Sequence, residues 1–235
     1  MTQGRPKPEN SVSVPSYEIS DSTAAIKARR LLNRLSEYAS IDNWRKVVKE
    51  IGLDEGLSST RNWKRLLFRS RKRHDMICLF FDRKKNFMEW PDTKKTSEVM
   101  LIKMSPDDRT SLNDDTIQRG IGLAFLGINR NDILNPHRGT RDSNWGKSGI
   151  LLSITFHVLQ RIIQRGHGLS EDGEIGYDLL LNYLYLIWLT AVQIRAEHQD
   201  FPADLTVNYN GTRFIVHAPD SQSTMTLITL LPQKK

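Results

Sequence analysis

Apolar and polar positions in the first part of the chain follow the spacing of helices. After Ser22, a candidate N-cap, apolar residues recur at helical spacing through Tyr38, and Lys and Arg fill much of the remaining surface. A second helix is predicted from about residue 42 to Gly52. A third helix follows the serine pair at residues 58–59.

The spacing then changes to that of strands. Short apolar runs bounded by polar residues predict strands at residues 76–81, 87–90 and 98–104, with a turn at residues 82–86. The pattern weakens after residue 105. A short helix is predicted around residues 117–125 in spite of Gly120 and Gly122, and residues 129–149 are interpreted as a long loop.

The last third of the chain has a clearer pattern. Asn210-Gly211 is a strong hairpin signal, because a type I′ turn needs positive φ at both central positions. Apolar periodicity predicts two helices, at residues 151–165 and 175–197, followed by three strands, at residues 205–209, 212–218 and 225–231.

These elements predict an α+β protein in two parts. The first is a basic half of three helices plus an antiparallel sheet, and the second is an α-α-β-β-β half with helices on one face of a small sheet. The predicted division is a disordered arm (residues 1–22), a basic domain (23–105), a loop-rich connector (106–149) and a C-terminal α+β domain (150–235).

Charge is placed unevenly along the chain. Residues 1–104 hold 22 Lys and Arg against 13 Asp and Glu, whereas residues 105–235 hold 12 against 14. Attraction to phosphates grows with local charge density. RNA or DNA phosphates are therefore the expected partners, with the first half as the docking part.

Composition also bears on location. Cys78 is the only cysteine, so no intrachain disulfide can form, and a cytoplasmic location is predicted. The polar start of the sequence has no apolar h-region, so no signal peptide is expected. The apolar stretch at residues 179–192 contains Asn182 and is shorter than the about 20 residues of a membrane span, so a core helix and no membrane partner are predicted.

Several motifs of well-known enzymes are absent from the sequence. It has no phosphate loop, dinucleotide-binding glycine pattern, serine nucleophile elbow or zinc-ligand spacing. Neither a cofactor nor a metal is therefore predicted.

The segment at residues 61–74 is the most basic stretch, with seven Lys or Arg in 14 positions. As a helix it gathers the cations on one face, while Trp63, Leu66 and Leu67 form the core side. Three helices followed by a hairpin is also the order of a winged-helix module. The alternative is a merely solvated face. The residues predicted to bind nucleic acid are Arg61, Lys64, Arg65, Arg69, Arg71, Lys72 and Arg73.

A second candidate site lies on the helix predicted at residues 151–165. His157, Arg161 and Arg165 fall within about 80° of one another on a helix, opposite an apolar stripe. Histidine transfers protons near neutral pH, and arginine stabilises a developing phosphorane, as metal-independent RNA cleavage requires. Arg213 and Thr229 are further candidates for phosphate contact. The alternative is an ordinary amphipathic surface helix.

The C-terminal part resembles small ribonuclease toxins of the RelE/BrnT-like and wider barnase–EndoU–colicin-like group. The resemblance covers at most residues 150–232 and implies a toxin-like effector that cleaves RNA without a metal. The chain departs from this group in its second long apolar helix, which stands between the motif helix and the strands. The matching residues are His157, Arg161, Arg165, Gly211, Phe214, Ile228 and Thr229.

Three hypotheses follow. The first is an RNA-cleaving effector, with His157 in acid–base work, Arg161, Arg165 and Arg213 on phosphate, and a neutralising protein or nucleic-acid partner. The second is a non-enzymatic nucleic-acid-binding protein that uses residues 61–73. The third is an interaction protein with the apolar helix as its interface. The sequence leaves the substrate and the oligomeric state open.

Overall fold

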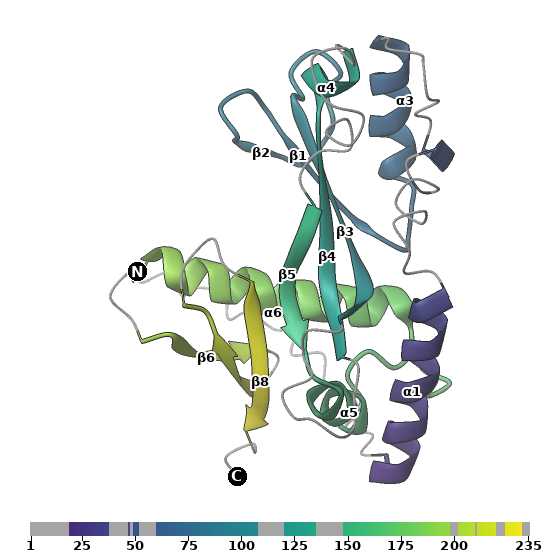
Figure 1. Cartoon of the computed structure of the whole chain (residues 1–235), viewed down its shortest axis with the longest axis vertical. Coiled ribbons are helices and arrows are strands. Elements are labelled where there is room, and N and C mark those ends of the chain that lie inside the picture. The colour runs from purple at the N-terminus through teal and green to yellow at the C-terminus, as the bar shows by residue number, and fades with distance from the viewer. Residues whose placement is uncertain are drawn as a thin grey trace, which may run out of the picture.

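The computed structural model describes residues 19–37, 47, 49–51, 60–107, 120–134, 148–197, 202–209, 211–219 and 224–231. In these residues the chain has an α+β fold built on one eight-stranded mixed sheet (Figure 1). The strands are β1 (Ile77–Phe81), β2 (Phe87–Met88), β3 (Glu98–Asp107), β4 (Gly120–Asn129), β5 (Ser148–Ile154), β6 (Asp204–Tyr209), β7 (Thr212–His217) and β8 (Met225–Leu231), in the order β2-β1-β3-β4-β5-β8-β7-β6.

The sheet joins the two halves that the sequence suggested. Every described strand pair is antiparallel except β5–β8, which is parallel. The chain reaches β8 from β5 through two helices and the β6–β7 hairpin. The predicted C-terminal strands therefore extend the first sheet and do not form a separate one.

Helices cover parts of both faces of the sheet. Figure 1 shows α3 along the upper strands, α6 crossing the sheet, and α1 beside α5 at the lower end. Alone among the described helices, α6 is long and apolar enough to cross a membrane by length and composition, and here it buries one side in the fold. The helices are α1 (Asp21–Glu37), α3 (Thr60–Ser70), α4 (Arg130–Leu134), α5 (Phe156–Gln164) and α6 (Tyr177–Glu197).

The fold has two hydrophobic cores on opposite faces of the sheet. Val99 and Leu101 of β3 pack in the core with α3, whereas Ile102 and Met104 pack in the core with α1, α5 and α6. Successive side chains of a strand point to opposite faces, so β3 serves both cores. The α3 core covers the upper part of one face, and the larger core covers the lower part of the other.

Most of the predicted elements are confirmed. The strands at residues 76–81, 87–90, 98–104, 205–209, 212–218 and 225–231 are present, with bounds shifted by a few residues, and so are the basic helix and the core helix. The hairpin at Asn210-Gly211 is confirmed by the Tyr209–Thr212 pair and by the φ of +73° at Gly211. The arm at 1–18, most of the second helix, residues 58–59 and the loop at 135–147 lie outside the described residues.

A loop-rich connector was predicted over residues 106–149. In the part of this range that the structure describes, strands and a short helix are found instead. β3 runs to Asp107, and the predicted helix at 117–125 is instead the strand β4. Nearly every residue of β4 is buried, because it lies in the middle of the sheet with cores on both faces. Such a strand has a continuous apolar sequence with no alternation. At Gly122 a Cβ atom would lie 2.8 Å from the Ile150 side chain, so the glycine permits close packing.

Two other boundaries are corrected. Residues 148–154, which straddle the predicted loop and helix, form β5, and Thr155 then caps α5 by accepting a hydrogen bond from the Val158 amide. At α1 the cap is Ser20 and not Ser22, because the Ser20 hydroxyl accepts from the Thr23 amide at 3.2 Å. The Ile19 amide also donates to Gln164. Residues 19–22 therefore belong to the fold and not to a disordered arm.

Candidate nucleic-acid interface

The helix α3 presents the predicted basic face to solvent. Trp63, Leu66 and Leu67 are fully buried against the sheet, which confirms that Trp63 is a core residue. The opposite side carries exposed cations, because the cations and the apolar residues alternate at helical spacing. The exposed ones on α3 are Arg61, Lys64 and Arg69, Arg65 is half-buried, and the exposed Arg71 and Lys72 lie in the turn that follows the helix.

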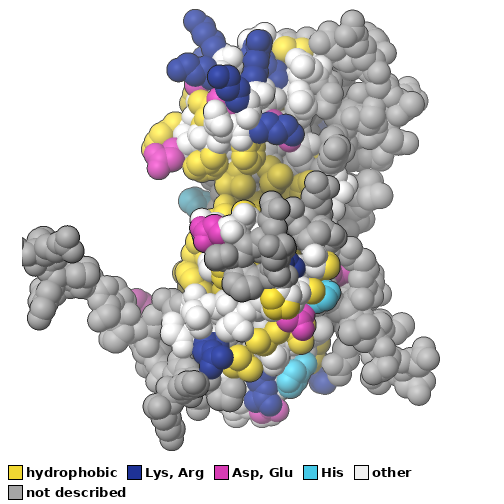
Figure 2. All heavy atoms as spheres, turned by 90° about the vertical axis from the view of Figure 1, so that its left-hand side faces the viewer, with side chains coloured by type: hydrophobic (Ala, Val, Ile, Leu, Met, Phe, Trp, Pro, Cys, Tyr) yellow, Lys and Arg dark blue, Asp and Glu magenta, His cyan; other side chains and the backbone are white. Residues whose placement is uncertain are grey.

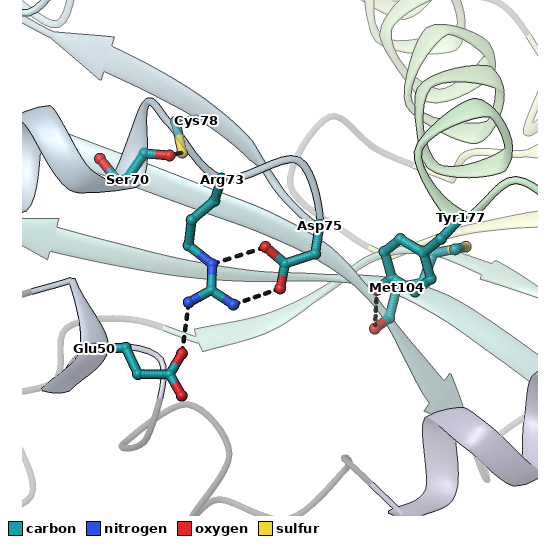
Figure 3. A network of polar contacts seen from close by, with 7 residues as sticks. All are labelled: Glu50, Ser70, Arg73, Asp75, Cys78, Met104 and Tyr177. Carbon is teal, nitrogen blue, oxygen red and sulfur yellow. Dashed lines mark hydrogen bonds and ion pairs between the residues drawn. The ribbon is translucent and has the colours of Figure 1, made fainter.

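Three of the predicted binding residues already have partners. Arg73 forms ion pairs with Asp75 and with Glu50, the latter at 2.7 Å (Figure 3). Arg69 donates to the Glu50 carbonyl at 3.1 Å. The Arg71 guanidinium lies 3.4 Å from the centre of the Trp90 ring, a cation–π contact. Arg73 in particular holds the fold together and is a poor candidate for binding phosphate.

The Arg73–Asp75 pair sets the charge state of its surroundings. Hydrogen bonds to Asp75 raise the pKa of Arg73. Burial acts to raise the pKa of Asp75, but the bonds and charge of Arg73 outweigh it and hold this pKa below its usual value. Nearby, burial raises the pKa of Cys78 to about 12, and its thiol donates to the Ser70 carbonyl. This thiol is therefore not a reactive nucleophile.

A basic pocket of about 400 Å³ opens at the upper end of the sheet. Its volume lies in the range of about 300–1,000 Å³ that is usual for ligand sites. It is formed by the β1–β2 turn, the loop before β3, and the junction of β4 with α4. Its lining residues are Arg83, Lys85, Lys94, Lys95, Thr96, Ser97, Glu98, Asn129, Arg130, Asn131 and Leu134.

Short polar contacts fix the loops that carry these cations. The Asp82 carboxylate accepts from the amides of Lys84 and Asn86 at 2.8 and 2.9 Å. The Asp92 carboxylate accepts from the Lys94 amide at 2.9 Å. Such Asp turns hold the backbone of a loop in one conformation, so the Cα atoms of the lysines have defined positions.

The pocket wall also contains buried donors without partners. Thr96 is fully buried, and its hydroxyl has no hydrogen-bond partner. The Arg130 Nε atom is also buried and without a partner, although its Nη1 atom donates to the Lys94 carbonyl at 3.3 Å. Buried polar groups usually have partners, and an exception calls for a ligand or water. Both residues line the pocket.

Charge in the pocket is strongly one-sided. It holds five Lys or Arg side chains and one carboxylate, Glu98, which lies 3.5 Å from the Lys85 amine. Figure 2 shows Lys and Arg side chains gathered at this end of the molecule, with hydrophobic side chains directly below them. Two aromatic rings are exposed in the same region: Phe87 is 59% exposed and Trp90 is 60% exposed. Cations beside exposed aromatic rings are typical of surfaces that bind nucleic acid.

The residues predicted for RNA cleavage are only partly brought together. His157 and Arg161 are exposed on one side of α5, opposite the buried residues Val158, Leu159 and Ile162. Arg161 donates to Gln164 and lies 3.9 Å from Asp21. Arg165 ends the helix and donates to the Leu231 carbonyl at 3.0 Å. The predicted face of the helix exists, but its last arginine is used to hold β8.

Arg213 and Thr229 lie on the other face of the sheet. In β7 the buried residues Phe214 and Val216 face α5 and α6, so Arg213, one position away, points to the opposite side. Thr229 pairs with Ile215 and shares that opposite face. The five residues proposed for catalysis therefore do not line one cavity. Among the described residues no group of three His, Cys, Asp or Glu is placed to hold a metal ion.

Sequence reasoning placed the functional surface on α3 and α5 and did not find the pocket. A partial signal was present, because the lysine pairs at residues 84–85 and 94–95 flank β2. His167 is half-buried. It stacks on Tyr183 and lies 3.0 Å from the Thr212 hydroxyl. Burial, aided by the charge of Arg165, lowers the pKa of His167 to about 4.

No protein-family model, curated protein or solved structure matches the chain. The resemblance of residues 150–232 to ribonuclease toxins therefore stays a prediction.

Proposed function

We propose that this protein binds nucleic acid through its basic end, defined as α3, the β1–β2 turn, residues 91–97 and α4. The observation that carries the proposal is the pocket with five cationic side chains and one carboxylate. Phosphate groups are the ligands that such a concentration of Lys and Arg favours.

The chemistry of the wall supports an anion as the ligand. Arg130 and Thr96 offer donors that have no partner within the fold. Phosphate oxygens accept several hydrogen bonds at once, and the Lys and Arg side chains of the pocket would neutralise the charge of a phosphate. β1 lies inside the sheet between β2 and β3, so the proposal uses the β1–β2 turn as part of the pocket wall and not as a wing.

The basic face of α3 extends the proposed surface. Arg61 and Lys64 are exposed near the start of α3, and α3 contacts α4, which carries Arg130 of the pocket. These cations add to the positive charge of the basic end, although α3 packs on the opposite face of the sheet from Glu98 and Asn129 of the pocket. The proposed partner is RNA or DNA, held mainly by its phosphates, and binding should weaken steeply with salt.

Fluorescence anisotropy with labelled RNA and DNA, repeated at several salt concentrations, tests the proposal. In Lys94→Gln/Lys95→Gln, the slope of the logarithm of the association constant against the logarithm of salt concentration should fall. The expected fall is roughly 1.4 to 1.8, because each lost phosphate contact removes about 0.7 for a single strand or 0.9 for a duplex.

A charge-matched control separates the pocket from the net charge of the protein. Arg30 and Arg34 are exposed on α1, far along the chain and outside the pocket. Arg30→Gln/Arg34→Gln removes the same charge and should leave the slope close to that of the unmodified protein. Equal slopes in all three proteins, or no binding at all, would contradict the proposal.

A second candidate function is metal-independent RNA cleavage by α5. The observation that favours it is the exposed pair His157 and Arg161, carried on one side of a helix whose other side is buried. An imidazole on a rigid helix is suited to general acid–base work. Because Arg213 and Thr229 point away from α5, this candidate now rests on His157, Arg161 and Arg165 alone.

Its test is RNA incubated with purified protein in EDTA. Cleavage through the 2′-hydroxyl should leave a 2′,3′-cyclic phosphate and spare DNA, and His157→Ala should lose about 10²–10⁴ in rate. The folded state of the variant is checked by circular dichroism. Intact RNA with the unmodified protein, or full activity in the variant, would remove this candidate and leave the binding function untouched.

A further inference from the structure

The basic pocket shares a face of the sheet with two aromatic rings. The register pairs Phe87 with Phe81, Phe81 with Glu98, and Glu98 with Asn129, so these four residues form one row across β2, β1, β3 and β4. Directly paired residues point to the same face. Glu98 and Asn129 line the pocket. With neighbouring strands about 4.8 Å apart, Phe87 stands about 10 Å from Glu98.

This face is not covered by the α3 core. Phe80, the neighbour of Phe81, is buried on the α3 side. On the opposite side Leu79 and Met100 pack at the edge of the larger core, whereas Phe81 is only half-buried and 59% of Phe87 is exposed. In Figure 2 hydrophobic side chains lie directly below the cations of the basic end. An apolar surface beside a cationic pocket suits a ligand that has both an apolar part and a negatively charged part.

The exposed ring is held in place by its neighbours. Phe81 meets Phe87 edge to face, with ring centres 6.4 Å apart and an interplanar angle of 73°. The turn between them is fixed by the bonds from the amides of Lys84 and Asn86 to Asp82. A ring on a rigid hairpin loses little conformational freedom when a planar group stacks on it.

We propose that this site takes single-stranded nucleic acid, with a phosphate in the basic pocket and a neighbouring base stacked on Phe87. The inference rests on the proposed function and names its substrate class. In a duplex each base is stacked between its neighbours, so an aromatic side chain on a flat sheet does not reach its face. In a single strand the base faces are free, and stacking on exposed aromatic residues is the usual mode of recognition.

The test compares one oligonucleotide as a single strand and as a duplex, using anisotropy with the full chain. Phe87→Ala should weaken single-strand binding by roughly 5- to 150-fold, the usual worth of one stacked base. Duplex binding and the salt slope should not change, because no cation is lost. Phe87→Trp should restore binding. Ile26→Ala, which removes an exposed apolar side chain on α1 outside the basic end, is the control and should bind as the unmodified protein does.

An abasic strand gives a second measurement that does not depend on any variant folding. The unmodified protein should bind it more weakly than the normal strand by about the factor that Phe87→Ala loses, and the variant should not discriminate between the two. Equal binding of both strands by the unmodified protein would overturn the inference, as would a preference for duplex. If either of these results is found while Lys94→Gln/Lys95→Gln still lowers the salt slope, only the single-strand inference fails. Absence of all binding to nucleic acid would refute the proposed function as well.

Discussion

The two ends of the sheet use their polar side chains differently. At the helical end, which comprises α1, α5, α6 and β6–β8, buried or half-buried polar groups bond to the fold itself: Arg165 to the Leu231 carbonyl, Arg195 to the Ala218 carbonyl, and His167 to Thr212. At the basic end, five cationic side chains surround a pocket with one carboxylate. Buried polar atoms without a partner occur at both ends among the described residues, at Trp63, Thr96 and Arg130 of the basic end and at Tyr183 of the helical end. Polar groups that bond within the fold stabilise it, whereas a cluster left to solvent marks a surface for a ligand.

The apolar side chains repeat this contrast. The helical end buries most of its large apolar residues in one core, to which α6 contributes Leu180, Leu184 and Ile187. The basic end has a smaller core and leaves Phe87 and Trp90 exposed. Burial stabilises the first arrangement, whereas exposed rings beside cationic side chains are a feature of surfaces that bind nucleic acid. This contrast supports the proposed binding role of the basic end.

The largest effect should come from a charge in the helical core. Leu184 of α6 is fully buried, so Leu184→Asp buries an unpaired carboxylate and should destabilise the fold by about 4 kcal/mol or more, enough to prevent soluble expression. Leu179→Asp on the same helix is the matched control, because Leu179 is 45% exposed. A folded Leu184→Asp protein with a normal thermal melt would break the assignment of α6 to the core.

A smaller effect is expected at His167. Its pKa is about 4 in the folded protein, below the usual 6.5, so the unfolded state binds more protons between these values. The free energy of unfolding should therefore fall by about 1–3 kcal/mol as the pH drops from 6.5 to 4. Denaturant titrations should show a flatter dependence in His167→Gln. His157→Gln, at an exposed histidine, serves as the control. If the unmodified protein and His167→Gln show the same dependence of unfolding free energy on pH, the buried role of His167 is contradicted.

The smallest effect concerns the ion pair between Arg73 and Asp75. Asp75→Asn weakens the pair with Arg73 and should cost about 1 kcal/mol at pH 7, since both groups are partly exposed to solvent. The pKa of Asp75 is lowered, so this contribution is present above the usual value of about 4 and is lost as the pH falls below it. Thermal melts at pH 7 and pH 3 measure the difference. Glu174→Gln, which removes an exposed partner of Lys27, should change little at either pH.

The fold was predictable where local pattern decides the structure. The strands of the last third alternate apolar and polar residues, and Gly211 marks their first turn, so both followed from the sequence. β4 did not, because a strand between two cores has no alternation to detect. β5 was hidden because only Thr155 separates it from α5, so the strand and the helix form one apolar run.

The candidate site was harder to predict because it is built from distant segments. The cations Lys85 and Lys94 come from two separate loops, and Arg130 comes from the start of α4. They meet because β1 pairs with β3 and β3 pairs with β4, and the register of those pairs depends on contacts across the whole sheet. The basic face of α3 depends only on helical spacing within one segment, so it was predicted correctly. Arg73 was assigned to it, but this residue forms ion pairs with Glu50 and Asp75.

Cross-linking followed by peptide mapping tests most directly which end of the molecule meets nucleic acid. A single strand with photoreactive bases is irradiated with the full chain, and the cross-linked peptides are identified by mass spectrometry. We predict cross-links within residues 79–98 and 129–134, with Phe87 among the modified residues and a strong loss in Lys94→Gln/Lys95→Gln. Cross-links concentrated on α5 around His157, and unaffected by that double variant, would contradict the assignment of binding to the basic end.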